Sequence, residues 1–338
     1  MPVPVHLVGS IGLDTVPEVF AAVGSALGPN LKRVPDGEPG GRRLWISFQY
    51  PLLRASPFLQ VVPDTNRQGN FPYLRVADGV APESIKFGEL NYAREARASY
   101  QDFCRARDKG QLPKGVRFQV CLPTPLAVVG PFCQPAAVPA IEPAYEKAMV
   151  AEVANICAEI PHQDLAIQWD VCIEMLMWDG RWPQSPKIPD LKGALTSRFA
   201  RLSGAVARDV ELGFHLCYGD LDGKHFIDPL DSAKMVELAN LLVVTAGRPV
   251  AFMHMPVPVA RHDEAFFAPL ANLALPAGTE LYLGCVHASD GVEGTKRRMA
   301  AARKFAPNFG IATECGMARA RTPSVVHDLI RVHAEAAR

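Results

Sequence analysis

The chain has 338 residues, with 35 basic and 35 acidic side chains and a hydrophobic content of 49%. A formal net charge of zero lacks the basic excess that nucleic-acid binding requires, so we exclude nucleic acid as a partner. No apolar stretch approaches the ~20 residues that span a bilayer, so we expect no membrane segment. The first residues contain no secretory signal pattern, and the eight cysteines therefore indicate reduced thiols in a cytoplasmic protein.

Short apolar runs alternate with helical patterns along the chain, which favours parallel strands joined by crossover helices. The first strand is predicted at residues 5–8. A helix is predicted over 16–27, with Thr15 as its candidate N-cap and Pro17 in its first turn, where the missing N–H costs nothing.

A second, short strand is predicted at residues 31–34. A long irregular insertion then occupies about residues 44–112, and the pattern within it predicts one helix over about 82–107. The insertion carries several aromatic side chains, including Trp45, that are suited either to a pocket wall or to simple packing.

Six further strands are predicted, at residues 116–122, 165–170, 213–218, 249–253, 280–287 and 310–313. Further helices are predicted over 145–159 and 323–337. Eight strand–helix units favour a single (β/α)8 TIM barrel over a doubly wound sheet. Because no repeat or linker interrupts them, we interpret residues 1–338 as one domain.

Active sites of such barrels lie at the carboxyl ends of the strands, where this chain places many polar residues. His215 and Cys217 are two apart on one strand and therefore project from the same face. Cys315 follows the last strand, and Gly316 permits close backbone approach there. Two thiols and an imidazole are ligands typical of zinc. The alternative for a single cysteine is a small buried hydrophobe, which we assign to Cys104, Cys121, Cys133, Cys157 and Cys172.

Two segments, residues 213–218 and 310–319 with its Glu-Cys-Gly-Met-Ala-Arg core, resemble the zinc-ligand segments of the cobalamin-independent methionine synthase family. Residues 9–10, 167–170 and 286–287 fall where that family has counterparts. The resemblance covers most of the chain outside the insertion, but it extends only to the family's C-terminal catalytic barrel. The wider superfamily also contains uroporphyrinogen decarboxylase.

The resemblance implies a Zn²⁺ ion held by His215, Cys217, Cys315 and a fourth ligand. The family has a glutamate at the position of His254, so His254 is a candidate for the fourth ligand. Alternatively, His254 contacts a ligand without binding the metal, or it contacts the substrate. A thiol on zinc is held as a thiolate and attacks a methyl or alkyl carbon. His287 is the candidate general acid, and its alternative is a surface loop histidine.

Further residues at the strand ends are candidates for substrate binding. Asp170 is expected to face the cavity and bind an amino group, while Glu174 shares that task or is a solvated carboxylate. Gly9 and Ser10 are expected to hold a carboxylate.

Asp36 and Glu38 lie in a Pro-Asp-Gly-Glu-Pro segment that has two interpretations. They either form a tight turn with an Asx hydrogen bond or grip substrate.

The sequence thus predicts a zinc-dependent methyltransferase or alkyltransferase that acts on a small-molecule thiol. The donor is methyltetrahydrofolate, a protein-bound methylcobamide or a small alkylated compound. One alternative is a metal-independent lyase or decarboxylase of the uroporphyrinogen decarboxylase type, which needs basic residues to grip several carboxylates. The other is a non-catalytic zinc-binding barrel whose metal site His254 closes.

Overall fold

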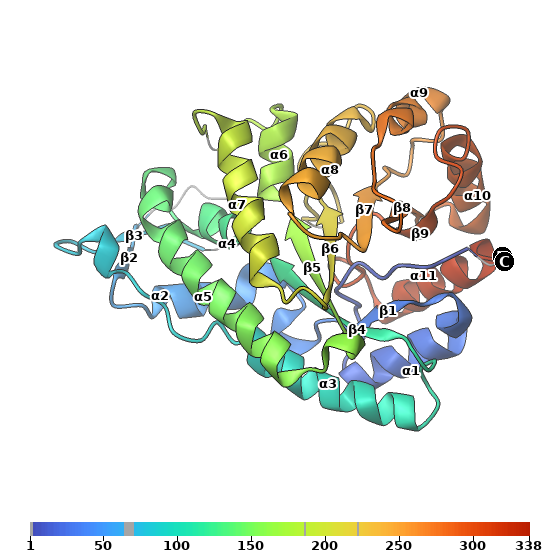
Figure 1. Cartoon of the computed structure of the whole chain (residues 1–338), viewed down its shortest axis with the longest axis horizontal. Coiled ribbons are helices and arrows are strands. Elements are labelled where there is room, and N and C mark those ends of the chain that lie inside the picture. The colour runs from blue at the N-terminus through green and yellow to red at the C-terminus, as the bar shows by residue number, and fades with distance from the viewer. Residues whose placement is uncertain (1–2, 64–70, 186, 222) are drawn as a thin grey trace.

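A computed structural model describes residues 3–63, 71–185, 187–221 and 223–338. Its main feature is one curled sheet of seven parallel strands in the order β1-β4-β5-β6-β7-β8-β9, with helices packed outside it (Figure 1). The strands are β1 (Arg33–Pro35), β4 (Arg117–Pro123), β5 (Leu165–Val171), β6 (Glu211–Leu216), β7 (Phe252–Pro256), β8 (Glu280–Val286) and β9 (Gly310–Thr313).

The helices that cover the sheet include those predicted from the sequence. The first begins as expected, because the Thr15 hydroxyl accepts a hydrogen bond from the backbone N–H of Glu18 at 3.3 Å. Within the described residues, no helix is both long enough and apolar enough to cross a membrane. The helices are α1 (Val16–Leu27), α2 (Gln49–Arg54), α3 (Tyr92–Asp108), α4 (Pro125–Phe132), α5 (Val138–Glu159), α6 (Ile173–Asp179), α7 (Leu191–Ala205), α8 (Ala233–Thr245), α9 (Glu264–Phe267), α10 (Gly291–Ala302) and α11 (Pro323–Ala336).

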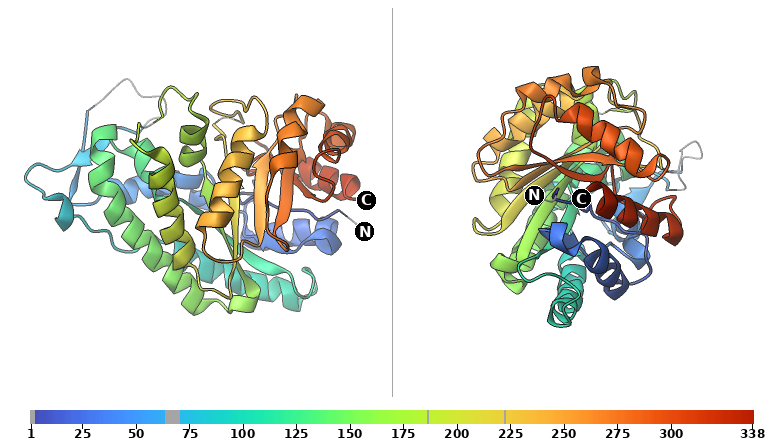
Figure 2. Two further views of the ribbon diagram at one scale, coloured as in Figure 1. Left: turned by 45° about the horizontal axis from the view of Figure 1, so that its top comes forward. Right: turned by 90° about the vertical axis from the view of Figure 1, so that its right-hand side faces the viewer.

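The N-terminal segment lies between the two edges of the sheet, but it is not the strand predicted at residues 5–8. Val5 forms only single bridges, to Leu31 before β1 and to Ile311 in β9. Pro4 has no N–H to donate, so a continuous ladder does not form there, although its carbonyl accepts from the N–H of Ile311 at 2.9 Å. The prediction of an eight-stranded barrel is therefore confirmed only as a curled, parallel, seven-stranded sheet. The start of the described chain lies beside its last helix, where the N–H of Val3 donates to the Ala337 carbonyl at 3.0 Å (Figure 2).

The insertion between β1 and β4 is shorter than predicted. It contains α2 and a small antiparallel hairpin of β2 (Leu59–Val61) and β3 (Leu74–Val76), at the far left of Figure 1. The predicted helix over 82–107 begins at Tyr92, because the Glu152 carboxylate of α5 accepts from the backbone N–H groups of Leu90 and Ala93 at 2.5 and 2.6 Å. Helix α3 packs against α1 and α5 as the crossover helix between β1 and β4.

Strand β7 begins and ends three residues later than predicted, and this shift moves His254. Pro249 cannot donate to a neighbouring strand, whereas the apolar run continues to Pro256. His254 consequently lies inside β7, in register with His215 of β6, and not just beyond the strand end.

A buried arginine joins distant strands at the amino end of the sheet. The Arg33 Nε of β1 donates to Glu211 of β6 at 2.5 Å, and its Nη1 donates to Glu280 of β8 at 2.8 Å. Because β4 to β7 lie between β1 and β8 in the sheet order, these contacts form only when the sheet is strongly curled.

We expect Arg33→Met to lower the free energy of unfolding by about 2 kcal/mol, since it removes the buried cation shared by Glu211 and Glu280 and leaves each carboxylate with one more exposed partner, Arg117 and Lys32 respectively. The control is Arg331→Ala, which removes an exposed pair on α11 and should cost less than about 0.5 kcal/mol. Urea denaturation measures both values. Equal stabilities of the two variants would contradict this account of the curl.

Candidate metal centre

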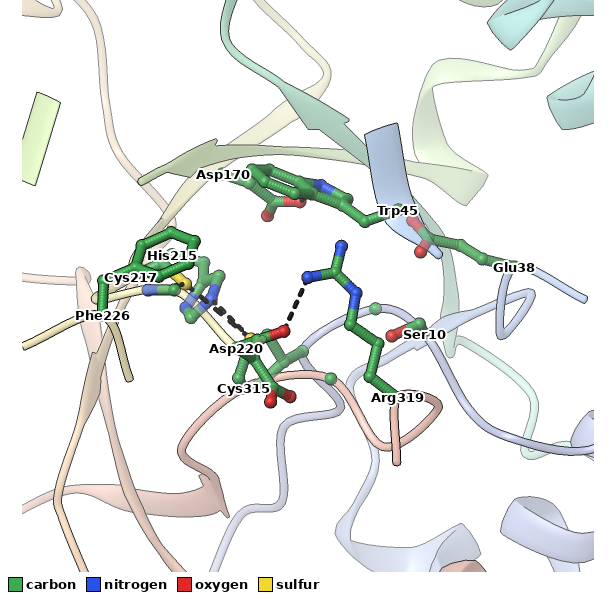
Figure 3. A pocket seen from close by; sticks show the side chains of 14 residues that line it. Ser10, Glu38, Trp45, Asp170, His215, Cys217, Asp220, Phe226, Cys315 and Arg319 are labelled. Atoms are coloured by element: carbon green, nitrogen blue, oxygen red, sulfur yellow. Dashed lines mark hydrogen bonds between the residues drawn. The ribbon is translucent and has the colours of Figure 1, made fainter. Parts of the chain in front are cut away.

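Three soft ligands converge at the carboxyl end of the sheet. His215 lies near the end of β6, Cys217 follows that strand, and Cys315 follows β9. One ligand atom from each lies within 4.8 Å of the others. The two Sγ atoms are 3.8 Å apart, and Cys315 Sγ lies 3.9 Å from His215 Nε2 (Figure 3). We call these three residues the metal triad.

The geometry of the metal triad fits Zn²⁺. Zinc–sulfur bonds of about 2.3 Å in a tetrahedral site place two thiolates about 3.8 Å apart, which matches the observed sulfur separation. An imidazole with two thiolates is also the donor set of known catalytic zinc sites, in which a fourth position stays open.

Without a cation the side chains of the metal triad are uncharged. A hydrogen bond with the Cys172 thiol, together with burial, raises the pKa of Cys217. Contact with Cys217, followed by burial, raises the pKa of Cys315. Burial lowers the pKa of His215, so its imidazole is neutral. Metal binding therefore has to release thiol protons, but it finds the imidazole already in its ligating charge state.

His254 lies beside the metal triad and contacts its imidazole. Its Nδ1 is 2.7 Å from Nδ1 of His215, and its Nε2 is 3.0 Å from the Thr313 carbonyl oxygen. Both ring nitrogens therefore have protein partners. Ligation of a metal by His254 stays a prediction, and it would require the ring to give up at least one of these contacts.

A pocket opens next to the metal triad. It encloses about 520 Å³ of empty space, including its open mouth. Four residues predicted to bind substrate, Gly9, Ser10, Glu38 and Asp170, line it together with the triad. The complete lining is Val8, Gly9, Ser10, Glu38, Trp45, Asp170, His215, Cys217, Gly219, Asp220, Phe226, Cys315, Gly316 and Arg319.

Glu38, Asp170 and Asp220 supply carboxyl groups to this lining, and the first two were predicted to bind substrate. Asp170 is held by hydrogen bonds from Trp45 Nε1 at 3.2 Å and from Gln168 Nε2 at 2.8 Å, and burial raises its pKa to about 7. Burial, and then the charge of Asp170, raises the pKa of Glu38 to about 8. Glu38 and Trp45 both have positive φ angles, of 53° and 56°, which shows that the surrounding structure imposes their orientation.

Asp36 does not line the pocket but contacts Glu38, which does. Its Oδ1 accepts from the backbone N–H of Glu38 at 2.9 Å, which is the Asx hydrogen bond predicted as one alternative. Its Oδ2 accepts from Arg42 at 2.8 Å and from Ser99 at 2.7 Å. Asp36 is thus occupied in fixing the turn that presents Glu38.

Glu174 and His287 are also outside the pocket lining. Glu174 is buried at the start of α6, which raises its pKa to about 7, so the alternative of a solvated carboxylate is wrong. His287 is only 8% exposed, so a surface loop histidine is wrong too. Its Nε2 is 2.8 Å from the Val257 carbonyl oxygen, and burial lowers its pKa to about 4.

Sequence reasoning assigned no role in the site to Asp220, Phe226 or Arg319. Arg319 Nη1 donates to the Asp220 carbonyl at 2.7 Å, and its guanidinium carbon lies 5.6 Å from the centre of the Trp45 indole. Asp220 follows Cys217 by three residues and Arg319 follows Cys315 by four, so proximity to the ligands was an available signal. Phe226 carries no such signal and reaches the pocket through its loop.

No protein-family model matches the chain, and no curated protein matches it. Among solved structures, it is similar to the putative vitamin-B12 independent methionine synthase from Listeria monocytogenes, with a TM-score of 0.58 and 12% identity over 99% of this chain and 98% of that one. It is also similar to a B12-independent methionine synthase from Shewanella sp. W3-18-1 in complex with selenomethionine, with a TM-score of 0.61 and 14% identity over 100% of this chain and 97% of that one. At these identities the likeness concerns the fold, and the chain has the fold of B12-independent methionine synthase-like proteins.

Proposed function

We propose that this protein is a zinc-dependent transferase that moves a methyl or alkyl group to a small-molecule thiol. The observation that carries the proposal is the convergence of His215, Cys217 and Cys315 at one side of an open pocket. The fold shared with methionine synthase-like proteins supports the same class of reaction. Three protein ligands leave one coordination position for the substrate sulfur.

A bound Zn²⁺ would lower the pKa of an incoming thiol and supply a thiolate at neutral pH. The remaining chemistry belongs to the chain. Asp170, fixed by Trp45 and Gln168, pairs with the ammonium group of an amino-acid thiol. Ser10 and the backbone at Gly9 lie on the same lining and receive its carboxylate. Holding the acceptor in one orientation is the protein's main contribution to the rate.

We assign protonation of the leaving group to Glu38 in place of His287. Glu38 lines the pocket, and with a pKa of about 8 it keeps its proton at neutral pH. His287 does not line the pocket, and its Nε2 contacts the Val257 carbonyl.

The contacts of the pocket disfavour a decarboxylase. That reaction type needs several cationic groups that are free to bind carboxylates. Among the described residues of the lining, Arg319 is the only arginine or lysine. Its guanidinium already donates to the carbonyls of Asp220 and Leu44.

A closed, non-catalytic zinc site needs a fourth protein ligand. His254 is the residue predicted as a candidate fourth ligand, and both of its ring nitrogens contact other groups. The donor classes that we propose to test are methyltetrahydrofolate, a methylcobamide protein and small alkylated compounds.

Wild-type protein should bind about one zinc ion per chain, and Cys217→Ser or Cys315→Ser should weaken binding at least about tenfold, since each removes a thiolate ligand. Thiol alkylation should fall to background in both. Metal analysis by mass spectrometry and a thiol-acceptor screen measure the two effects, with Cys104→Ser as the control, since Cys104 lies on α3 outside the triad. Full transferase activity in chelator-treated, zinc-free protein would contradict the proposal.

Adding the acceptor thiol to the zinc-loaded protein should raise the number of sulfur atoms at about 2.3 Å from zinc from two to three in X-ray absorption spectra, because the fourth position is open. An unchanged coordination shell at saturating thiol would favour the non-catalytic zinc-binding alternative.

Glu38→Gln should make the zinc-free protein more stable than wild type at pH 8 but not at pH 5. The raised pKa means that folded Glu38 holds its proton more tightly than the unfolded chain, so wild-type stability declines as pH rises from about 4.5 to about 8. Because Glu38 keeps partial exposure, we expect the difference to grow by roughly 1–2 kcal/mol over this range.

Urea denaturation across this pH range measures the difference, and Glu83→Gln, at an exposed position before α3, is the control. Parallel pH profiles for wild type and Glu38→Gln would show that Glu38 does not hold the proton we assign to it.

A further inference from the structure

We infer that His254 is a positioning residue that selects the ligating tautomer of His215, so that the chain supplies three metal ligands and not four. This inference rests on the proposed zinc site and specifies how that site is prepared. It concerns hydrogen-bond direction, which the contacts of the two imidazoles determine.

The first contact fixes the proton of His254. Its Nε2 lies 3.0 Å from the carbonyl oxygen of Thr313, and a carbonyl oxygen can only accept a hydrogen bond. Nε2 of His254 therefore carries a hydrogen. The His254 side chain is fully buried, and the low dielectric of the interior favours the neutral imidazole. Nδ1 of His254 is then a bare acceptor.

The second contact fixes the position of the hydrogen on His215. Nδ1 of His215 lies 2.7 Å from Nδ1 of His254, a separation that requires one hydrogen between the two nitrogens. His254 has none to give at that atom, so His215 donates. A neutral His215 protonated at Nδ1 leaves Nε2 with a free lone pair, and Nε2 is the atom that lies 3.9 Å from Cys315 Sγ.

The sheet places the two imidazoles side by side. His215 and His254 are direct partners in the parallel register of β6 and β7. Thr313, the last residue of β9, accepts from His254 through its carbonyl and donates through its hydroxyl to the Cys315 carbonyl at 2.6 Å. Thr313 thus contacts both His254, which orients His215, and the loop that carries Cys315.

Two substitutions at position 254 separate positioning from packing. In His254→Asn the amide oxygen takes the place of Nδ1 and still accepts from His215. In His254→Gln the amide nitrogen takes the place of Nε2 and still donates to Thr313, but the acceptor for His215 is lost. Loss of a partner that orients a metal-bound histidine typically weakens metal binding about 10- to 100-fold.

Zinc competition with a chromophoric chelator should therefore show about 10- to 100-fold weaker binding in His254→Gln, and His254→Asn should stay within about threefold of wild type. Zinc X-ray absorption of wild type should show a single imidazole. Equal weakening in both variants, or a second imidazole on the metal, would overturn the inference while leaving the zinc site intact. A wild-type protein without affinity for zinc would overturn the proposed function and this inference together.

A measurement on zinc-free protein tests the tautomer directly. Long-range ¹H–¹⁵N spectra of histidine-labelled protein should report His215 protonated at Nδ1 in wild type and in His254→Asn, and a mixture of tautomers in His254→Gln. The nine histidines are assigned by single substitutions. A wild-type His215 protonated at Nε2 would overturn the inference whatever the zinc affinity.

Discussion

The curl of the parallel sheet is the constraint on which the site depends. Cys217 and Cys315 follow β6 and β9, and β7 and β8 lie between those strands in the sheet. In a flat sheet with strands about 4.8 Å apart, the ends of β6 and β9 would be roughly 14 Å from each other. The observed sulfur separation of 3.8 Å exists because the sheet bends round a shared interior. Arg33 shows the same bend at the opposite end of the strands, where it contacts Glu211 and Glu280.

Several polar side chains are buried inside the curled sheet, and their hydrogen bonds give them defined directions. Gln168 of β5 illustrates this. Its amide nitrogen donates to Asp170 at 2.8 Å, and its carbonyl oxygen is 2.9 Å from His6 Nε2. A buried polar group without a partner costs about 1–3 kcal/mol, so each of these contacts favours one side-chain conformation. Asp170, which lines the pocket, is therefore held in one orientation by its contact with Gln168.

The pocket lining combines two kinds of donor atom. Figure 3 shows Asp170 and the Trp45 indole close to His215 and Phe226, with Glu38 farther from them. Asp170 is the direct register partner of His215 in the neighbouring strand. The metal triad offers soft donor atoms, and Asp170 offers carboxylate oxygens that suit an ammonium group. A small molecule that carries both a thiol and an ammonium group would complement both, which is why we propose an amino-acid thiol in preference to a polycarboxylate.

Much of this arrangement was predictable from local sequence. The spacing of His215 and Cys217 placed both on one face because strand side chains alternate, and Thr15 with Pro17 marked the start of α1. The Asx turn at Asp36 followed from its own residue type. Each of these features depends on neighbours within a few positions along the chain, which is the range over which backbone geometry acts.

Only the tertiary structure decided the features that depend on distant partners. Strand β7 ends at Pro256, which moves His254 inside the sheet opposite His215. Glu152 of α5 sets where α3 begins, and burial sets the protonation of Glu38 and Asp170. The sequence determined which candidate ligand types this protein carries and at which strand ends they occur. Their distances, directions and charges came from packing, because burial and register are properties of the whole sheet.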